Sequence, residues 1–433
     1  MRWILLLALL LAAPAAATET LPLRERAAIT DRILKDRLDT LLPGLMREAG
    51  IDMWILVARE YNEDPVLATM LNATSFHARR RTILVLHDPG PGQPVERLTV
   101  SRYGLGGLFE PAWVPEEEPD QWQRLAAIVA ERNPRRIGIN VSSGSAFADG
   151  LTAGEYRGLT QALSPDFRQR LVSAEPLAIA WLETRTPAEI ELYGDVVKTA
   201  HAIIREGLSG AAIQPGVTTA ADLQWWYRER IAQAKLDTWF HPSVAIFREG
   251  AAGELTGNAV IQPGDLVWTD IGILYLGLAT DTQTFAYVLK PGETEAPAGL
   301  RRGLANANRV QDALTSSFAT GRSGNEILGE ARRKAIAAGL NPSIYSHPVG
   351  KHGHGAGAAI GFWDNQQPTE KGEHRLRPNT LWAIELSHSE AVPEWGGQLV
   401  PFRTEVNALF DGRQVRYIDG RQTEYLLIPS HAP

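Results

Sequence analysis

The chain has 433 residues, of which 44% are hydrophobic and 8% aromatic, a composition that supports two or three packed domains and excludes a disordered protein. Its 43 basic and 50 acidic residues give a net charge of -7 without a long Lys/Arg run, which argues against nucleic acid as a partner. The absence of cysteine excludes disulfides, thiol catalysis, thiolate zinc sites and iron–sulfur clusters, so ten histidines and 50 acids remain as potential metal ligands.

The first residues have the composition of a secretory signal peptide. Arg2 precedes an apolar run at residues 3–13, and small residues at 15–17 follow it. The apolar run is shorter than a helix that spans a bilayer, which argues against a stable membrane anchor. We therefore expect residues 1–17 to be a signal peptide cleaved after Ala17, and the mature protein to be exported, either to the periplasm or as a secreted protein.

Helix and strand patterns alternate from residue 22 to about residue 142. A charged amphipathic helix is predicted over residues 22–49, ended by Gly50, and the apolar runs DMWILVA and RRTILVLHD predict strands. LTVSRYG, the helical pattern DQWQRLAAIVAERN and RIGINVS continue the alternation. The pattern predicts an α/β domain with a mixed sheet, which we assign to residues 18–180.

A second domain is predicted over residues 181–433. Thr186, Pro187 and Glu189 have the spacing of an N-cap, a first-turn proline and a capping box at the start of a helix. Helical sequence returns at residues 298–338, whereas most of the remainder reads as strands and turns. This mixture predicts an α+β domain.

Two aspartates lie in apolar sequences that predict a hairpin joined at residues 275–277. Asp270 is in LVWTDIGI and Asp281 is in GLATDTQTFAYV. Pairing across the turn can bring both carboxylates to one face, where a buried carboxylate is costly without a cation. On this pair alone, solvated strand carboxylates or turn formers are an equal alternative.

Three histidines, His347, His352 and His354, fall within eight residues, and glycines flank His354 in GKHGHGAGAAIGFWD. Glycine removes side-chain bulk and lets the backbone bring an imidazole close to a buried centre, with a solvated glycine-rich surface loop as the alternative. Glu385 and Glu405 lie in the apolar sequences NTLWAIELSHSE and QLVPFRTEVNALF. Buried glutamates are rare unless they are paired, so these two also need a partner.

Four carboxylates and one imidazole at a single site would repel one another, whereas two divalent cations would neutralise the four negative charges. Oxygen-rich ligation with one nitrogen suits Mn²⁺, Co²⁺, Fe²⁺ or Zn²⁺, of which Mn²⁺ is our first candidate. A water between two such ions is ionised near neutral pH and can attack a polarised carbonyl. The pattern therefore predicts hydrolysis at a site for two metal ions formed by Asp270, Asp281, His354, Glu385 and Glu405.

The order of these five residues, with a step of 11 residues between the aspartates and GHGAG around the histidine, resembles the pita-bread metallopeptidases. The alternating α/β half resembles the N-terminal domain of aminopeptidase P, prolidase and creatinase, so the resemblance implies an α/β domain followed by an α+β pita-bread domain. It implies that Asp270 binds one ion, that Asp281 and Glu405 bridge both, and that His354 and Glu385 complete the ligands. It also implies Glu385 as the general base and a peptide substrate whose second residue is proline.

The sequence departs from this family pattern at several positions. Related peptidases carry accessory histidines four residues before and seven after the metal-binding histidine, where this chain has Gly350 and Gly361. They also tend to carry an arginine after the second aspartate, where this chain reads DTQT with Gln283. Four nearby histidines are candidate replacements for the accessory histidines: His241, His347, His352 and His388. Our predicted catalytic set consists of Glu385 with His241, His352 and His388.

Two alternatives remain open. A creatinase-like C–N hydrolase shares the fold and needs no metal, but the retention of all five ligand types argues against it. A non-catalytic pita-bread protein that binds peptides is the other alternative, although such domains generally lose the ligand set. We expect a peptide substrate, with proline-containing peptides first, and a homodimer as in related proteins.

Overall fold

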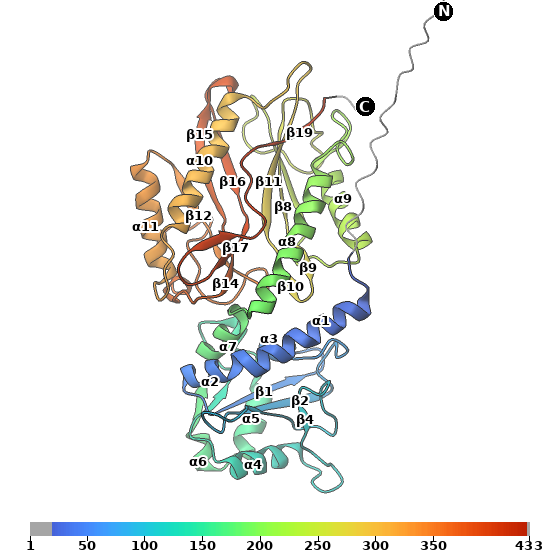
Figure 1. Ribbon diagram of the computed structural model, residues 1–433, viewed down its shortest axis with the longest axis vertical. Coiled ribbons are helices and arrows are strands. Elements are labelled where there is room, and N and C mark those ends of the chain that lie inside the picture. The colour runs from blue at the N-terminus through green and yellow to red at the C-terminus, as the bar shows by residue number, and fades with distance from the viewer. Residues whose placement is uncertain (1–19, 431–433) are drawn as a thin grey trace, which may run out of the picture.

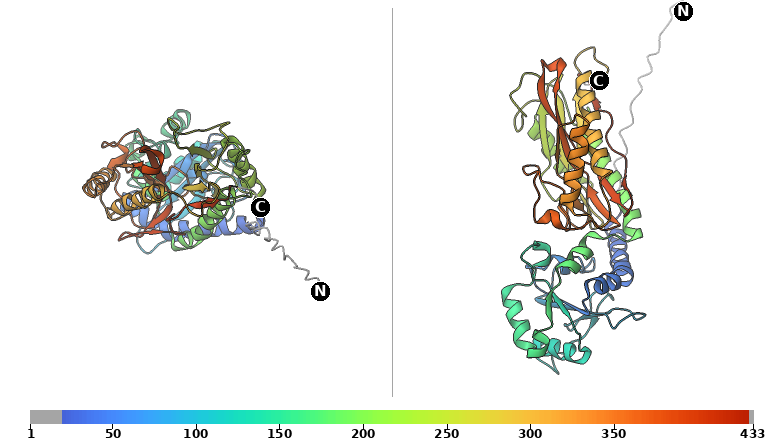
Figure 2. Two further views of the ribbon diagram at one scale, coloured as in Figure 1. Left: turned by 90° about the horizontal axis from the view of Figure 1, so that it is seen from above. Right: turned by 90° about the vertical axis from the view of Figure 1, so that its left-hand side faces the viewer.

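Two parts stacked along the long axis of the molecule make up the computed structural model, which describes residues 20–430 (Figure 1). The lower part contains the N-terminal segments, and helix α8 (Pro187–Gly207) runs from the junction along the upper part. Figure 2 shows the same division from a second direction. No helix within the described residues combines the length and the apolar character needed to cross a membrane. The predicted signal peptide at residues 1–17 lies outside the described residues.

A six-stranded sheet between helices forms the N-terminal part. Its elements are α1 (Leu23–Asp36), a π-helical turn (Arg37–Leu41), α2 (Leu42–Ala49), β1 (Met53–Arg59), α3 (Pro65–Ala68), β2 (Arg81–His87), β3 (Glu96–Thr99), β4 (Glu110–Pro111), α4 (Gln121–Arg132), β5 (Ile137–Ile139), a 3-10 turn (Ala146–Ala148), α5 (Ala153–Ala162), α6 (Pro165–Arg168) and β6 (Leu171–Ser173). The strand order is β4-β3-β2-β1-β5-β6, with β1 antiparallel to β2 and parallel to β5. The predicted mixed sheet is therefore confirmed.

Strand β1 is buried on both of its faces. Trp54 and Leu56 pack with residues of α1 and α2, whereas Ile55 and Val57 belong to a second cluster with residues of α4 and α5. Because helices cover both sides of the sheet, residues 53–58 of the strand are all buried, and only Arg59 at its end is exposed. This arrangement explains the uninterrupted apolar run in the sequence.

The C-terminal part is built from sheets covered by pairs of helices. Helix α7 (Glu175–Glu183) packs in the core of the N-terminal part. The elements of the C-terminal part are α8, α9 (Ala220–Gln233), β7 (Ser243–Phe247), β8 (Leu266–Ile271), β9 (Leu274–Tyr275), β10 (Leu278–Ala279), β11 (Thr282–Val288), α10 (Ala298–Thr315), α11 (Gly324–Ala337), β12 (Pro342–Ile344), β13 (His347–Val349), a 3-10 turn (Lys371–Glu373), β14 (Thr380–Ala383), β15 (Leu386–Val392), a 3-10 turn (Pro393–Trp395), β16 (Gln398–Thr404), β17 (Asn407–Phe410), β18 (Val415–Tyr417) and β19 (Leu426–Ile428). Helices α8 and α9 pack on the sheet β19-β11-β8-β7, and α10 and α11 pack on β12-β15-β16 and β13-β14-β17-β18. The predicted α+β character is confirmed, and the boundary predicted at residue 180 falls within α7.

The helix start predicted at Thr186 is present with its capping box. The Thr186 hydroxyl accepts a hydrogen bond from the Glu189 amide at 3.3 Å, and the Glu189 carboxylate accepts one from the Thr186 amide at 3.0 Å. The helical stretch predicted over residues 298–338 contains a break, because Ser323 and Glu326 form a further capping box that starts α11 as a separate helix. Local capping signals therefore locate helix starts in this chain.

The predicted hairpin is present as β8 and β11, and its tip is the short pair β9 and β10. Strands β8 and β11 pair antiparallel with Gln283 opposite Asp270. At the tip, Leu276 and Gly277 have φ values of 53° and 73°, the left-handed conformations that a two-residue hairpin turn requires.

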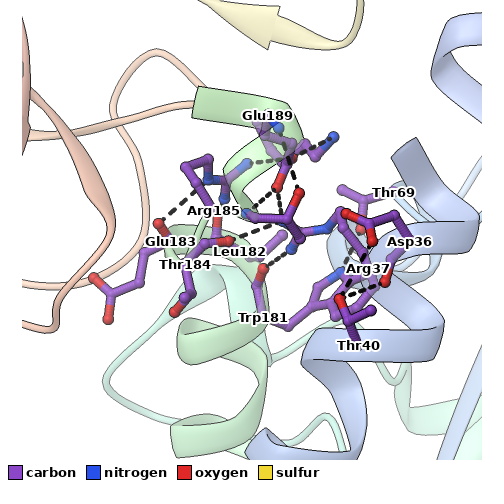
Figure 3. Close-up of polar contacts among 12 residues, drawn as sticks. Asp36, Arg37, Thr40, Thr69, Trp181, Leu182, Glu183, Thr184, Arg185 and Glu189 are labelled. Carbon is purple, nitrogen blue, oxygen red and sulfur yellow. Dashed lines mark hydrogen bonds and ion pairs between the residues drawn. The ribbon is translucent and has the colours of Figure 1, made fainter. Parts of the chain in front are cut away.

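A buried cluster of charged side chains joins the two parts (Figure 3). Arg37 of the N-terminal part donates to Glu189 Oε2 at 2.5 Å, and Arg185 donates to Glu189 Oε1 at 3.0 Å. Lys351, from the loop after β13, brings its Nζ to 3.4 Å from the same Oε1. The side chains of Arg37, Arg185 and Glu189 are 0% exposed. One carboxylate thus serves three cations from three separate segments.

The surroundings of Glu189 set the ionisation of the whole cluster. Burial alone would raise the pKa of Glu189, but Arg185, Arg37 and Lys351 hold it well below the usual value. Burial lowers the pKa of Arg185 to about 10 and that of Lys351 to about 8, despite the neighbouring carboxylate. Arg37 is fixed further, because it donates to the carbonyls of Trp181 and Thr184 and lies 4.3 Å from the centre of the Trp181 ring.

Replacing Glu189 by glutamine should destabilise the protein strongly. Glu189→Gln leaves the three cations buried without their counter-charge, a change that typically costs about 3–5 kcal/mol of unfolding free energy. Urea denaturation followed by tryptophan fluorescence measures this loss. The control is Glu191→Gln on the same helix, since Glu191 is exposed. Equal unfolding midpoints for the two variants would show that the cluster does not hold the parts together.

Candidate metal centre

Four acids and two histidines, carried by strands β8 and β13 and by segments next to other strands, gather in the interior of the C-terminal part. Their ligand atoms form three groups, each with all atoms within 4.8 Å of one another. The groups are Asp270 with Asp281 and Glu405, His347 with Glu385 and Glu405, and Asp281 with His347 and His354. Because each pair of groups shares one residue, the three groups form one continuous cluster.

Strand pairing explains how the acids meet. Asp270 lies opposite Gln283, and Asp281 precedes Gln283 by two residues, so both aspartates face the same side of the hairpin, as the sequence predicts. The Gln283 amide donates to the Glu405 carbonyl at 3.2 Å, which brings the segment between β16 and β17 alongside β11. The Ile384 amide donates to the Val406 carbonyl at 2.9 Å and sets Glu385 beside Glu405.

His347 occupies the centre of the acid cluster. Its Nε2 lies 3.6 Å from Asp281 Oδ2, 3.8 Å from Glu405 Oε1 and 3.9 Å from Glu385 Oε2. His354, the ligand predicted from the sequence, belongs to a single group and packs its ring edge-on against His347 with 4.8 Å between ring centres. His354 also contacts Trp239 and Tyr345, with ring centres 5.0 and 5.9 Å away.

A signal for His347 was present in the sequence. His354 follows His347 by seven residues, which is the spacing between the metal-binding and accessory histidines of the pita-bread metallopeptidases. Glycines flank His354, whereas Ser346 and Pro348 flank His347, so the glycine pattern by itself favours His354 as the ligand. In the structure, Gly353 and Gly355 allow close approach of other groups: a side chain at Gly353 would collide with Trp239, and one at Gly355 with the Pro348 carbonyl.

The other histidines of the predicted catalytic set make their contacts elsewhere. The His388 ring lies 3.0 Å from Glu390 and accepts a hydrogen bond from the Asn341 amide at 3.1 Å. His241 is exposed and lies against Trp225, with 5.2 Å between ring centres. His352 packs on Phe147 of the N-terminal part at 4.6 Å. None of these three histidines belongs to the groups of ligand atoms found in the described part of the chain.

Burial dominates the electrostatics of the cluster. It raises the pKa of Asp270 to about 7 and the pKa of Glu385 to about 8, in the latter case together with the charge of Asp270. Burial and the neighbouring acids raise the pKa values of Asp281 and Glu405 well above their usual range. Burial and the nearby His354 lower the pKa of His347 to about 3, so its imidazole is neutral at physiological pH.

Three buried ligand atoms point to a divalent metal. Asp270 Oδ1, Glu405 Oε1 and His347 Nε2 have no hydrogen-bond partner among residues 20–430. Buried polar atoms rarely remain unpaired, and several carboxylates with a neutral imidazole are the donors that Mn²⁺, Fe²⁺, Co²⁺ and Zn²⁺ accept. The residues present therefore fit a divalent metal.

A cavity of about 630 Å³ opens beside the cluster. Asp270, Gln283 and Glu385 line one side of it. Its other walls include Trp268, Ser343, Tyr345, Trp363, Pro401 and Arg403. Arg403 is held at 2.8 Å from Glu254, and its guanidinium lies 5.2 Å from the centre of the Trp268 ring. A ligand in this cavity would thus meet metal ligands on one side and aromatic surface on the other.

A buried carboxylate–histidine cluster open to a cavity defines the class of protein: a metal-dependent hydrolase built on a two-part α/β and α+β fold. Residues 195–408 match the model of metallopeptidase family M24. This segment of the chain is therefore a domain of that family, and the fold is the predicted pita-bread fold preceded by an α/β domain. The peptidase assignment made from the sequence is therefore confirmed at the level of the family.

Solved structures share this fold over nearly the whole chain. An X-Pro aminopeptidase from Thermotoga maritima is 15% identical with a TM-score of 0.61, covering 89% of this chain and 99% of that one. An Xaa-Pro dipeptidase from Bacillus anthracis is 17% identical with a TM-score of 0.58, covering 94% and 100%. A variant of aminopeptidase P from Escherichia coli is 13% identical with a TM-score of 0.59, covering 94% and 97%. A comparison with curated proteins found no match.

The metal-free protein should lose stability as the pH rises toward 8. The pKa of Glu385 is raised from 4.5 to about 8 in the folded chain, and that of Asp270 from 3.8 to about 7. At pH values between the unfolded-state and folded-state pKa values, the folded chain therefore binds more protons than the unfolded chain. This stabilisation is complete below the unfolded-state values and is lost as the two groups ionise. Bound Mn²⁺ compensates the charge, so the gain in Tm on adding Mn²⁺ should increase from about pH 6 to about pH 8. Calorimetry with Mn²⁺ or EDTA measures it, and a gain independent of pH would contradict these pKa shifts.

Proposed function

We propose that this chain is an exported peptidase that uses two divalent ions and resembles Xaa-Pro aminopeptidases in its substrates. The observation that carries the proposal is the overlap of the ligand groups, in which Glu405 belongs both with Asp270 and Asp281 and with His347 and Glu385. Such sharing suits two adjacent ions, because a carboxylate can bridge a pair. The relatives named X-Pro aminopeptidase and Xaa-Pro dipeptidase support the substrate class.

Two sets of side chains would hold the ions. Asp270, Asp281 and Glu405 would hold the first, and His347, Glu385 and Glu405 the second, with Asp281 close enough to His347 to serve both. Bound ions supply a Lewis acid for the peptide carbonyl and lower the pKa of water. The net charge of four carboxylates matches two divalent ions, and Mn²⁺ remains our first candidate.

Glu385 is the proposed proton carrier. Its Oε1 accepts from Gln283 at 2.8 Å, and its Oε2 faces His347 at 3.9 Å. Glu385 also lines the cavity, so it can take a proton from the attacking water and deliver it to the leaving amine of a bound peptide. His354 is proposed to contact the substrate rather than an ion, because it stands beside His347 at the edge of the cluster.

The residues that line the cavity favour a proline-containing peptide. Trp268, Tyr345 and Trp363 offer apolar surface to a pyrrolidine ring, which has no N–H to satisfy. Arg403, which is half-buried and lies 2.8 Å from Glu254, also lines the cavity and offers its guanidinium to a peptide carboxylate. A non-catalytic peptide-binding role is disfavoured, because the four acids would then be buried together without a reason.

Metal analysis and peptide hydrolysis test the proposal together. Elemental analysis of protein loaded with Mn²⁺ should give about two ions per chain, and the loaded protein should cleave Xaa-Pro peptides. Glu385→Ala should lower kcat at least about 100-fold, and His347→Ala should lose one ion, whereas His354→Ala should keep two ions and lose activity. His241→Ala is the control and should behave as the wild type. Wild-type protein that binds two ions but cleaves no Xaa-Pro peptide would contradict the proposed substrate class. Wild-type protein that binds no metal would refute the whole proposal.

Export is proposed from the sequence of residues 1–17. Expressed in a host with a secretion pathway, the protein should appear outside the cytoplasm with Thr18 as its first residue, because the small residues at 15–17 form the cleavage site. Mass spectrometry of the intact purified protein measures this. A chain that retains residues 1–17 would contradict cleavage.

A further inference from the structure

Gln283 places a neutral amide between two of the acids. Its side chain is buried, with 5% of the residue exposed, and it lines the same cavity as Asp270 and Glu385. Its Nε2 lies 2.8 Å from Glu385 Oε1 and 3.4 Å from Asp270 Oδ2. An amide nitrogen carries two hydrogens, so one can serve each carboxylate.

Gln283 contacts one carboxylate oxygen of Glu385 and one of Asp270. Gln283 holds Oε1 of Glu385, while Oε2 is the oxygen that faces His347. It holds Oδ2 of Asp270, while Oδ1 has no partner in the described part of the chain. Each acid therefore has one oxygen tied to protein and one left for another ligand.

We propose that Gln283 is a positioning residue that fixes the orientation of Asp270 and Glu385 and so tunes the affinity of the site for its two ions. The proposal rests on the two-metal function proposed above. Without Gln283, each carboxylate is free to rotate about its last bond and to present either oxygen. Residues that hold metal ligands in place typically change metal affinity about 10-fold to 100-fold when they are replaced.

The chemistry of glutamine suits this position. A glutamate here would add a fifth negative charge to the four buried acids. A serine or threonine hydroxyl has a single hydrogen and a shorter reach, so it cannot donate to both acids. The amide donates twice and leaves the balance of four carboxylates against two divalent ions unchanged.

Backbone hydrogen bonds hold Gln283 in place and so fix the position of its side-chain amide. The residue pairs with Asp270 across the hairpin, and its own amide donates to the Glu405 carbonyl at 3.2 Å. Gln283 thus contacts three of the four acids, Asp270, Glu385 and Glu405, through its side chain or its backbone. Because the residue is buried in strand β11, little side-chain freedom remains to be lost when the ions bind.

Metal titration of a matched pair of variants tests this role. Gln283→Met removes the donor and keeps the length of the side chain. Gln422→Met is the control, since Gln422 is also bonded to β11, accepting from the Phe285 amide at 2.9 Å and donating to its carbonyl at 2.7 Å, but touches none of the acids. Calorimetric titration of the full-length metal-free protein with Co²⁺ gives both affinities, and visible absorption reports the geometry around Co²⁺.

Gln283→Met should weaken the binding of at least one Co²⁺ about 10-fold to 100-fold and change the visible spectrum. Gln422→Met should retain both affinities and the wild-type spectrum, with at most a lower Tm. If Gln283→Met does not fold, Gln283→Asn replaces it, because the shorter amide loses its reach to Glu385 and should give the same direction of change.

Two results would overturn the inference, and they are distinguishable. Wild-type protein that binds no Co²⁺ would refute the proposed function and this role together. Wild-type protein that binds two ions, with an unchanged affinity and spectrum in Gln283→Met, would refute the role of Gln283 alone.

Discussion

The buried carboxylate of Glu189 is the constraint on which the arrangement of this molecule depends. Arg37 comes from the N-terminal part, Arg185 from the link between α7 and α8, and Lys351 from the loop that carries His354. A buried cation without a partner is far more costly than one that is paired, so the three segments must meet at Glu189. The same residue closes the capping box of α8, which ties the start of that helix to the junction.

Charge of the opposite sign accumulates at the metal centre a short way along α8. Tyr193, one turn after Glu189, lies between the two regions: its hydroxyl donates to the Ala279 carbonyl at 2.9 Å, and both Arg185 and Asp281 act on its ionisation. Burial, followed by the charge of Asp281, raises the pKa of Tyr193 well above its usual value, so it remains neutral between the two. Around Glu189 three cations face one carboxylate, whereas the candidate metal centre brings together four acids that fit a divalent ion.

Local signals in the sequence were sufficient for much of the fold and for the acids. Capping residues gave helix starts such as Thr186, and the spacing of Asp270 and Asp281 gave their common face. Contacts between distant segments could not be read in this way. His347 reaches the acids because β13 pairs with β14, which puts His347 opposite Ala383, two residues before Glu385. The partner of Arg37 lies 152 residues away, and no local pattern in either segment predicts the contact.

The long sequence separation within the Glu189 cluster orders the assembly of the molecule during synthesis. The N-terminal sheet can be completed once Ser173 has been made, and domains generally fold in the order in which they emerge. Arg37 is then without its partner until Glu189 has been synthesised, and Glu189 is without Lys351 until a further 162 residues have been added. The Glu189 cluster between the two parts is therefore completed late, when the segment that carries Lys351 and the histidines has been synthesised. In a truncated chain that ends before this segment, the cluster would remain accessible to solvent.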